Sequence, residues 1–361
     1  MDYIPFTEKY TEDWDGFCIE NDLALFWHST LLMKIVLNRR TYLDSRNCSF
    51  FVKDGKETLA VVPLTIDNNT TESSCNIEMN YSGFNVPMPV VSKSLEAKGR
   101  NKILKGIYKE IDRIAGLNEV SRLTIMIPLT LSSCTKYNYF NFLVKYGFHD
   151  YNQYTQILRL SSNEEILWRG LSENHRRSIK KGQKYLNFRL FTNENISENI
   201  VELFKTFYFE VAGKITHPDA FFKVLYSIIK NNYGILGQAL YKGKAVGYVF
   251  NIYFKDQAYY LLGAKLRDFD VCPVAHSLHW ELIKYLKKIG IFSYELGLQQ
   301  FGPTIYEQPT EKELSISRFK KGFGGETIPV YIGEKFYSKD YFKKTWGKRT
   351  QRYLTESNNL L

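Results

Sequence analysis

Hydrophobic and polar positions along the first 150 residues change repeatedly between two periods, and each change predicts a new element. Apolar residues spaced by three and four positions predict helices, whereas short apolar runs bounded by turn residues predict strands. The spacing predicts helices over residues 19–36 and 94–114 and a further helix that ends at Gly147. Strands are expected at 50–53, 58–66, 77–81 and 121–127.

The same order of elements recurs after residue 150. Helices are expected at 163–184, 197–211 and 218–230, and strands at 154–160, 233–241, 245–254, 257–263 and 291–296. Pro273 opens a further helix that ends near Gly290 and whose apolar stripe is Ala275, Leu278, Leu282, Tyr285 and Leu286. Two α/β halves of similar plan therefore meet near residue 150, and we expect two domains, 1–150 and 151–361.

Composition supports a folded protein and narrows the class of partner. Of the 361 residues, 44% are apolar, and 26 Tyr and 25 Phe indicate well-packed cores. Lysine and arginine number 48 against 38 aspartate and glutamate, which leaves a formal net charge of +10. This excess favours anionic partners such as nucleotides, coenzyme phosphates, tRNA or a membrane surface, without choosing between them.

The cysteines and the apolar runs indicate the compartment. The five cysteines are scattered, and no pair has CxxC spacing, so neither a zinc site nor a disulfide framework is predicted. The sequence shows no signal segment, and its longest apolar runs fall well short of the roughly 20 residues that cross a bilayer. We expect a cytoplasmic protein without stable membrane insertion.

The run at 315–325, Ser-Ile-Ser-Arg-Phe-Lys-Lys-Gly-Phe-Gly-Gly, is the most informative part of the sequence. Its double glycine lets the backbone turn or pass close to another group, and Phe319 is suited to wedge such a turn against a core. Lys320 and Lys321 then place fixed positive charge beside the bend, as suits a site that stabilises developing negative charge. The alternative is a simple turn with solvated lysines.

A second basic feature lies on a predicted helix. Spacings of four place Arg176, Lys180 and Lys184 on one stripe, with Arg177 and Lys181 beside it. Such a face suits coenzyme pyrophosphate, a nucleotide or a tRNA backbone, although a run of charges is also typical of a solvated helix face.

Two residues are candidates for a general base. Glu295 lies at the end of a predicted strand, and His217 precedes a proline at a helix start. A salt bridge for Glu295 and a helix cap for His217 are the structural alternatives. His276 and His279 are three apart on a helix, but without an apparent third ligand they predict no metal site.

Four segments, in order, resemble the Fem-type peptidyltransferases and their relatives among the GNAT-like acyltransferases. They are the basic helix at 168–181, the Tyr-Tyr-Leu-Leu-Gly-Ala strand at 259–264, the Tyr-Glu-Leu-Gly strand end at 294–297 and the Phe-Lys-Lys-Gly-Phe-Gly-Gly run at 319–325. Together they cover about residues 155–335, while residues 20–150 match more loosely, through Phe26-Trp27-His28-Ser29 and Lys34.

This resemblance implies an α/β (α+β) fold of two GNAT-like domains, each a central mixed sheet flanked by helices. It implies transfer of an acyl group to an amine, with acyl-coenzyme A as donor and a nucleotide-linked (dTDP- or UDP-) amino sugar for surface polysaccharide such as lipopolysaccharide O-antigen as acceptor. Lys320 matches a lysine near the reacting carbonyl, and Lys34, Tyr260 and Phe319 fall where relatives contact the acceptor. The absence of a cysteine or serine nucleophile motif favours direct attack.

The sequence departs from the family pattern in two places that bear on the identity of the acyl donor. The Arg/Gln-x-x-Gly-x-Gly/Ala loop of ordinary GNAT enzymes is not evident before the helix at residue 273. The sequence therefore does not show which residues hold the donor's phosphates. The long helical arm of some tRNA-dependent members is also missing, which favours coenzyme A. The alternatives are an aminoacyl-tRNA-dependent transferase acting on a peptidoglycan precursor, and a non-enzymatic basic binding protein on a transferase scaffold.

Overall fold

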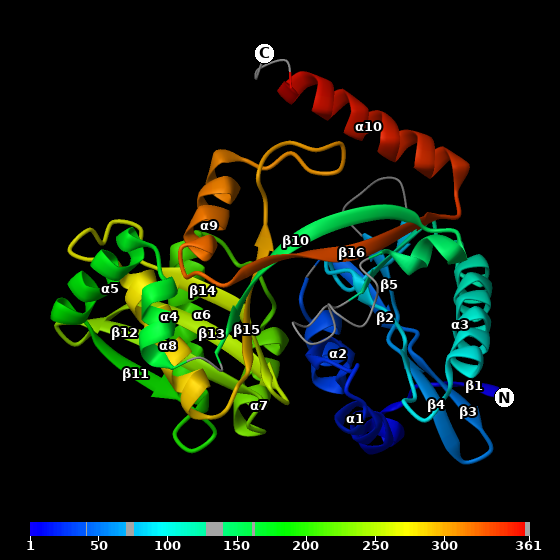
Figure 1. The fold of residues 1–361 in the computed structure, drawn as a ribbon, viewed down its shortest axis with the longest axis horizontal. Helices are drawn as coiled ribbons and strands as arrows, with labels where there is room; N and C mark the ends of the chain where they lie inside the picture. Colours follow the sequence, from blue (N-terminus) through cyan, green and yellow to red (C-terminus); the bar gives the residue numbers. More distant parts are fainter. Residues whose placement is uncertain (41, 70–75, 128–139, 161–162, 358–361) are drawn as a thin grey trace. The chain divides into compact units, whose positions relative to one another are not determined.

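The structure is a computed structural model that describes residues 1–40, 42–69, 76–127, 140–160 and 163–357. The chain forms two compact units, in which sheets are flanked by helices (Figure 1). The first comprises Met1–Gln153, Phe301–Glu311 and Pro329–Leu361, and the second comprises Tyr154–Gln300 and Lys312–Ile328. The mixed α/β fold class expected from the sequence is confirmed. The domain boundaries 1–150 and 151–361 stay a prediction.

The first unit contains two groups of strands. One is the sheet of β1 (Asp2–Pro5), β3 (Phe50–Asp54), β4 (Glu57–Val62) and β8 (Val90–Val91), in that order. The other runs in the order β16 (Glu326–Phe336), β9 (Arg122–Ile127), β6 (Ile77–Met79), β5 (Thr65–Asn69) and β2 (Leu43–Asn47), with β7 (Val86–Pro87) also paired to β9.

Helices of the first unit follow the apolar spacing of the sequence. The longest, α3 (Ala97–Leu117), buries Ile103, Ile107, Ile111 and Ala115, which lie four residues apart along one face. The others are α1 (Thr11–Glu20), α2 (Thr30–Leu37), α10 (Lys339–Ser357) and the short 3₁₀ turns η1 (Glu8–Tyr10), η2 (Phe26–His28) and η3 (Phe142–Tyr146). The helix expected to end at Gly147 is this last 3₁₀ turn, and residues 128–139 before it lie outside the described part of the chain.

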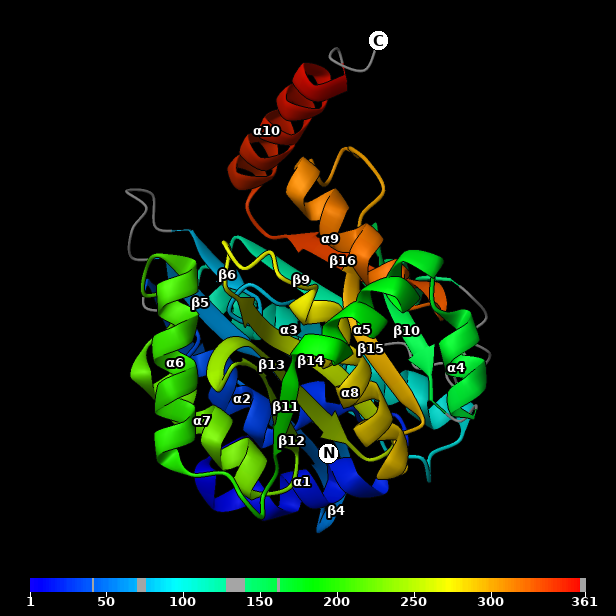
Figure 2. The same ribbon diagram turned by 90° about the vertical axis from the view of Figure 1, so that its left-hand side faces the viewer.

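The second unit is a sheet with helices on both faces. Its strand order is β11 (Asn187–Phe191), β12 (Gly234–Tyr241), β13 (Lys244–Phe254), β14 (Gln257–Lys265), β15 (Ser293–Gln299) and β10 (His149–Arg159). Its helices are α4 (Glu164–Gly170), α5 (Glu173–Tyr185), α6 (Glu198–Ala212), α7 (Asp219–Lys230), α8 (Val274–Lys288) and α9 (Glu311–Lys321). Figure 2 shows α6 and α7 on one side of this sheet and α5 and α8 on the other.

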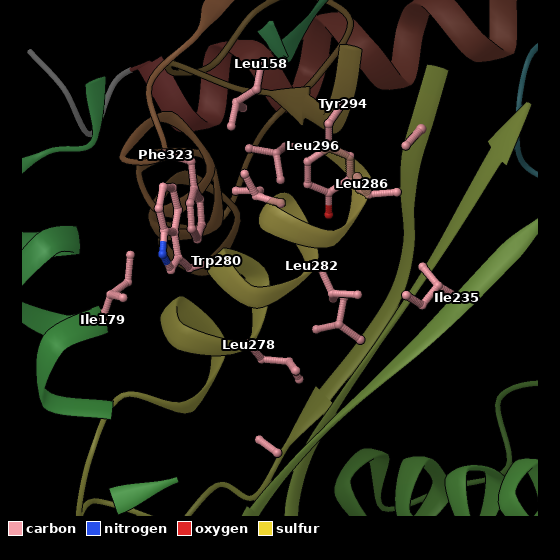
Figure 3. Packing of buried hydrophobic residues seen from close by; sticks show 14 of the residues in the cluster. Leu158, Ile179, Ile235, Leu278, Trp280, Leu282, Leu286, Tyr294, Leu296 and Phe323 are labelled. Carbon is pink, nitrogen blue, oxygen red and sulfur yellow. The ribbon is translucent and has the colours of Figure 1, made fainter. Parts of the chain in front are cut away.

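The core of the second unit lies between α8 and the sheet. Leu278, Leu282 and Leu286 are four residues apart and pack toward Ile235 of β12 (Figure 3). Gly237 of the same strand leaves room for two of these leucines, because a Cβ there would press against Leu278 and Leu282. The period-four stripe predicted after Pro273 is therefore a core face, and it fixes the position of α8.

Two predicted helices are each divided in the structure, because side chains compete for the backbone at the breaks. Of the helix expected over 19–36, residues 19–20 fall in α1 and residues 30–36 in α2, with the 3₁₀ turn η2 between them. The chain leaves the helix at Asn21, whose Oδ1 accepts a hydrogen bond from the Leu23 amide and whose Nδ2 donates to the Val91 carbonyl. The helix expected over 163–184 is split into α4 and α5, since Ser172 caps α5 by accepting from the His175 amide.

Two further expectations are corrected. The strand expected over 58–66 is divided into β4 and β5, which Pro63 separates. The basic part of the run at 315–325 is not a loop, because α9 continues to Lys321 and Lys320 lies in its last turn. The turn follows in the glycines: Gly324 and Gly325 both have positive φ angles, and a Cβ at either would collide with a neighbouring backbone carbonyl, that of Gly170 or Ile157.

Candidate active site

Strands β14 and β15 lie side by side at their start and then separate. Their parallel pairing joins Gln257–Tyr259 with Ser293–Glu295, although both strands continue, to Lys265 and Gln299. Each strand carries an irregularity in its other pairing at this point. The register of β14 against β13 shifts between Phe250 and Asn251, and that of β15 against β10 shifts between Gln156 and Ile157. Because a bulge bends its strand, the two shifts account for the fork.

A cavity of about 570 Å³ lies beside the open part of β14, within the second unit. Much of its lining is apolar: Tyr248, Val249, Phe269, Val274, Leu278, Ile316 and Phe319. Its polar lining is formed by Lys181, Tyr260, Lys265, Asp270, His276, His279, Ser315 and Lys320. The start of α8 also lines it, and no side chain caps that helix end. The cavity therefore combines an apolar slot with a positive helix terminus.

Lys320 is held at this cavity by the end of α9. Its Nζ donates a hydrogen bond of 3.1 Å to the Leu298 carbonyl on β15. The helix end is fixed by His175, whose Nε2 lies 2.9 Å from the Phe319 carbonyl oxygen. Gly322 makes this possible, because a Cβ at residue 322 would fall on the His175 ring. The glycine after the two lysines thus helps to position Lys320.

Lys320 and Glu295 influence each other's protonation. Burial raises the pKa of the Glu295 carboxyl, and the hydrogen bond from Thr155 and the charge of Lys320 lower it in part. The Thr155 hydroxyl donates to Glu295 Oε1 at 2.7 Å. Burial lowers the pKa of the Lys320 ammonium, which the charge of Glu295 partly offsets. An acid that binds its proton more tightly and a base that holds it less tightly lie together, as in sites that move protons.

Three polar side chains form a buried chain next to the fork. His279 Nδ1 lies 3.2 Å from the Tyr294 hydroxyl, which donates to Asn251 Oδ1 at 3.1 Å. The exposed fractions of these three residues are 1%, 0% and 0%. Burial lowers the pKa of His279 to about 3, helped by the nearby His276, Lys320 and His175. His279 is therefore uncharged at neutral pH.

Tyr260 lies at the fork itself, directly after the last paired residue of β14. Its ring meets the edge of the His279 ring with centroids 4.8 Å apart. Burial raises the pKa of its hydroxyl to about 12, with a smaller effect of Tyr208. The hydroxyl occupies the place that a Cβ at Gly263 would fill. Tyr260, Phe319 and Lys320, which the sequence singled out separately, are thus brought to one cavity.

The predicted basic stripe on α5 divides into different roles. Lys181 lines the cavity. Arg176 instead donates to the carbonyls of Arg169 and Leu171 at the end of α4. Arg177 is exposed beside Glu173, and Lys180 is exposed and lies over the Trp168 ring. The stripe is therefore not a single surface that faces the cavity.

His217 and Lys34 lie elsewhere. His217 is buried at the start of α7 and stacks on Phe221 with ring centroids 4.3 Å apart, so it takes part in the aromatic cluster of α6 and α7. Neither His217 nor Glu295 is among the residues that line the cavity, but Glu295 interacts electrostatically with the lining residue Lys320. Lys34 is an exposed residue in the last turn of α2, in the first unit. Their predicted roles as base and as acceptor contact stay predictions.

Sequence reasoning gave no role to Thr155 or Asn251, named Tyr294 only as part of the motif at 294–297, and considered His279 only as a metal ligand. The signal for His279 was a polar residue within the apolar stripe of α8, three positions after His276. Among the described residues, no group of three potential ligands is arranged to hold a metal ion. None of the helices in the described part of the chain combines the length and apolar character needed to cross a bilayer.

Comparison with known proteins agrees with this geometry. Residues 169–307 match the family model described as "Acetyltransferase (GNAT) domain". No curated protein sequence matches the chain. Three similar solved structures show the fold. The crystal structure of FemX has a TM-score of 0.65 at 15% identity and covers 96% of this chain and 100% of its own.

Two other solved structures also match nearly the whole chain. The C-terminal domain of a putative lysylphosphatidylglycerol synthetase from Agrobacterium fabrum has a TM-score of 0.58 at 13% identity, covering 98% of this chain and 96% of its own. A tandem GNAT protein from the clavulanic acid biosynthesis pathway has a TM-score of 0.53 at 9% identity, covering 93% and 98%. Residues 169–307 thus match a GNAT acetyltransferase domain, and the chain as a whole has a tandem GNAT-like fold.

Proposed function

We propose that this protein transfers an acyl group from acyl-coenzyme A to the amine of a nucleotide-linked (dTDP- or UDP-) amino sugar in the cytoplasm, for surface polysaccharide. The observation that carries the acyl-transfer part is the fork between β14 and β15, beside which lies the cavity that contains Lys320. The fork exposes the strand edge of β14, whose unpaired backbone groups are suited to bind the amides of an extended donor arm.

The residues present fit the coenzyme in two respects. The uncapped start of α8 opens onto the cavity with Lys181 and Lys265 nearby, which suits a pyrophosphate. The apolar lining suits the arm and the acyl group. Asp270, also in the lining, has the opposite charge. It marks the departure from the glycine-rich phosphate loop of ordinary GNAT enzymes.

The chemistry needs no covalent enzyme intermediate. The neutral amine attacks the thioester carbonyl, the C–N bond forms, and the Lys320 ammonium stabilises the oxyanion. Glu295 accepts the proton that the amine loses, for which its raised pKa suits it. The C–S bond then breaks, and the thiolate leaves and takes up a proton. His217 is the second candidate base, and Lys34, Tyr260 and Phe319 are the proposed contacts of the acceptor.

A second donor is also supported by observations. FemX and the lysylphosphatidylglycerol synthetase domain share the fold, and the name of the second points to transfer of a lysyl group. The exposed face of α5 carries Arg177, Lys180 and Lys184, which suits an RNA backbone. The alternative is therefore an aminoacyl-tRNA-dependent transferase that acts on a peptidoglycan precursor.

Donor assays separate the two functions. Purified protein is incubated with dTDP- and UDP-amino sugars together with a set of coenzyme A thioesters, and in parallel with charged tRNA and a peptidoglycan precursor. We expect turnover with a coenzyme A thioester, and a rise in melting temperature with coenzyme A, because a ligand that binds the folded state stabilises it. Turnover with charged tRNA but with none of the coenzyme A thioesters would show that the donor is aminoacyl-tRNA.

Lys320→Ala tests the chemical step, with Lys321→Ala as a matched control from the next residue. Removing one oxyanion donor lowers kcat by about 10²- to 10³-fold. Lys321 is exposed and does not line the cavity, so its variant is expected to keep wild-type turnover. Equal activity of the two variants, both folded, would remove the role of Lys320.

A further inference from the structure

The buried chain His279–Tyr294–Asn251 has a structural cost that packing does not explain. It joins α8, β15 and β13 inside the apolar core of the second unit, at the level where the sheet divides. Asn251 Nδ2 is buried and has no partner among the described residues. Buried polar groups weaken a fold unless they are satisfied. A buried chain of three polar side chains that ends at a cavity therefore indicates that the chain has a function at that cavity.

Counting hydrogens along the chain defines the state of His279. The Tyr294 hydroxyl has one hydrogen and donates it to Asn251 Oδ1. With Asn251 Oδ1 as the acceptor of that bond, the hydrogen in the contact of 3.2 Å between Tyr294 and His279 Nδ1 comes from the histidine. The ring is uncharged, so it carries this hydrogen alone and Nε2 keeps its lone pair.

His279 also borders the cavity, together with Tyr260 and Lys320. A histidine that donates through Nδ1 and lies at a ligand cavity offers its other nitrogen as a fixed acceptor. Its low proton affinity makes it a poor base, but it accepts a hydrogen bond without gaining a charge that would compete with Lys320.

We propose that Asn251 and Tyr294 hold His279 in the neutral Nδ1–H form, so that Nε2 accepts a hydrogen bond from an N–H group of the ligand in this cavity. The N–H belongs either to an amide of the donor's arm or to the attacking amine, which share this chemistry. The proposal rests on the proposed function for the identity of the ligand, but not for the state of the histidine.

Nitrogen-15 NMR of labelled histidine tests the state of the ring without any substrate. At neutral pH we expect the His279 signals of a neutral Nδ1–H ring. Tyr294→Phe removes the acceptor that selects this form and is expected to shift the ring toward Nε2–H. Tyr259→Phe, which removes another buried hydroxyl whose partner is Gln257, should leave the signals unchanged. An Nε2–H ring or an imidazolium in the wild type would overturn the proposal, whatever the enzyme transfers.

Two substitutions at His279 then test the acceptor. Asn reaches the position of Nδ1 and keeps the bond to Tyr294, whereas Gln reaches the position of Nε2 and keeps an acceptor toward the cavity. Loss of one uncharged hydrogen bond costs about 3- to 10-fold, so His279→Asn should lose this much and His279→Gln should remain near wild type. The reverse order, or equal losses, would show that His279 only supports Tyr294 or the packing.

The same variants identify the source of the N–H. Weaker binding of a coenzyme A thioester, measured by titration, assigns it to the donor's amide. An unchanged donor affinity with a slower single-turnover rate assigns it to the attacking amine. If no thioester reacts, the proposed function fails while the NMR result still decides the state of His279.

Discussion

Two carboxylates, one in each unit, show how differently the molecule uses buried charge. Glu334 of β16 is completely buried, and Arg349 of α10 contacts both of its oxygens at 2.7 and 2.8 Å while Arg122 of β9 adds a third bond of 3.0 Å. Glu295 of β15 accepts a hydrogen bond from Thr155, the one such bond that the described residues give it, and it lies within the electrostatic influence of Lys320, whose own pKa is lowered.

The difference lies in how completely each charge is matched. Glu334 has guanidinium partners on two elements, and this pairing fastens α10 to the strands of the first unit. Glu295 remains incompletely matched, so its proton affinity is raised. Removing one partner of a fully paired buried carboxylate destabilises the fold, whereas an incompletely paired carboxylate is available for chemistry.

The largest effect is expected for the first unit. Glu334→Gln removes the counter-charge of Arg349 and one of the two carboxylate partners of Arg122, which keeps Glu78. Breaking such a buried pair costs about 3–5 kcal/mol in the free energy of unfolding. Denaturant unfolding measures this loss. Turnover per folded molecule should not change, and a wild-type free energy of unfolding would contradict the structural role of Glu334.

Glu295→Gln is expected to lower turnover without lowering stability. Loss of a general base lowers kcat by about 10²- to 10⁴-fold. The folded-state pKa of this acid is raised, so its ionised form weakens the fold once the pH rises through that pKa, and the uncharged amide should leave the melting temperature equal or higher. A strong destabilisation with normal kcat would show that Glu295, like Glu334, has a structural role.

The histidines of the second unit predict a pH dependence of stability. Burial first, and then the neighbouring His175 and Lys265, lower the pKa of His276 to about 4. The unfolded chain therefore binds more protons than the folded one between about pH 6.5 and 4, so stability is present above this window and is lost as the pH falls through it.

His276→Gln should flatten this dependence by on the order of 2–3 kcal/mol. Unfolding curves between pH 7 and pH 4 measure it. Parallel curves for the variant and the wild type would show that His276 is not responsible.

The smallest effect concerns the position of Lys320. Gly322→Ala places a methyl group against the His175 ring that holds the end of α9, and such overpacking costs about 1–3 kcal/mol. We expect a lower melting temperature together with reduced kcat. Gly347→Ala is the control, because a Cβ there meets nothing within 4 Å and alanine favours the helix. Similar losses in both variants would argue against a specific contact with His175.

Local signals were sufficient for most elements of the second unit. The period-four stripe after Pro273 became the core face of α8, and the hairpin strands before it became β12, β13 and β14. The breaks within two expected helices were not predicted, because they depend on hydrogen bonds made by side chains. Asn21, for example, bonds the Val91 carbonyl 70 positions away.

Only part of the candidate site was predicted, because local motifs indicate some of its residues while contacts between distant positions determine the others. Lys320, Phe319 and Tyr260 were found because they belong to ordered motifs, and the structure brings them to one cavity. Thr155 was not found, because its partner Glu295 is 140 residues away and neither position has a local pattern that indicates the bond. Helix spacing placed Arg176 on a basic stripe suited to a phosphate group, but spacing could not indicate that its guanidinium donates to the carbonyls of Arg169 and Leu171 at the end of α4.

The sequence by itself determined the mixed α/β fold class and the candidate lysine that precedes the glycines of the run at 319–325, because periodicity and motif order are properties of neighbouring residues. Tertiary structure alone decided that β14 and β15 separate, since the fork arises from irregular pairing with two other strands. It also decided the state of His279, because the hydrogen of Tyr294 is accepted by Asn251, 43 positions earlier in the chain.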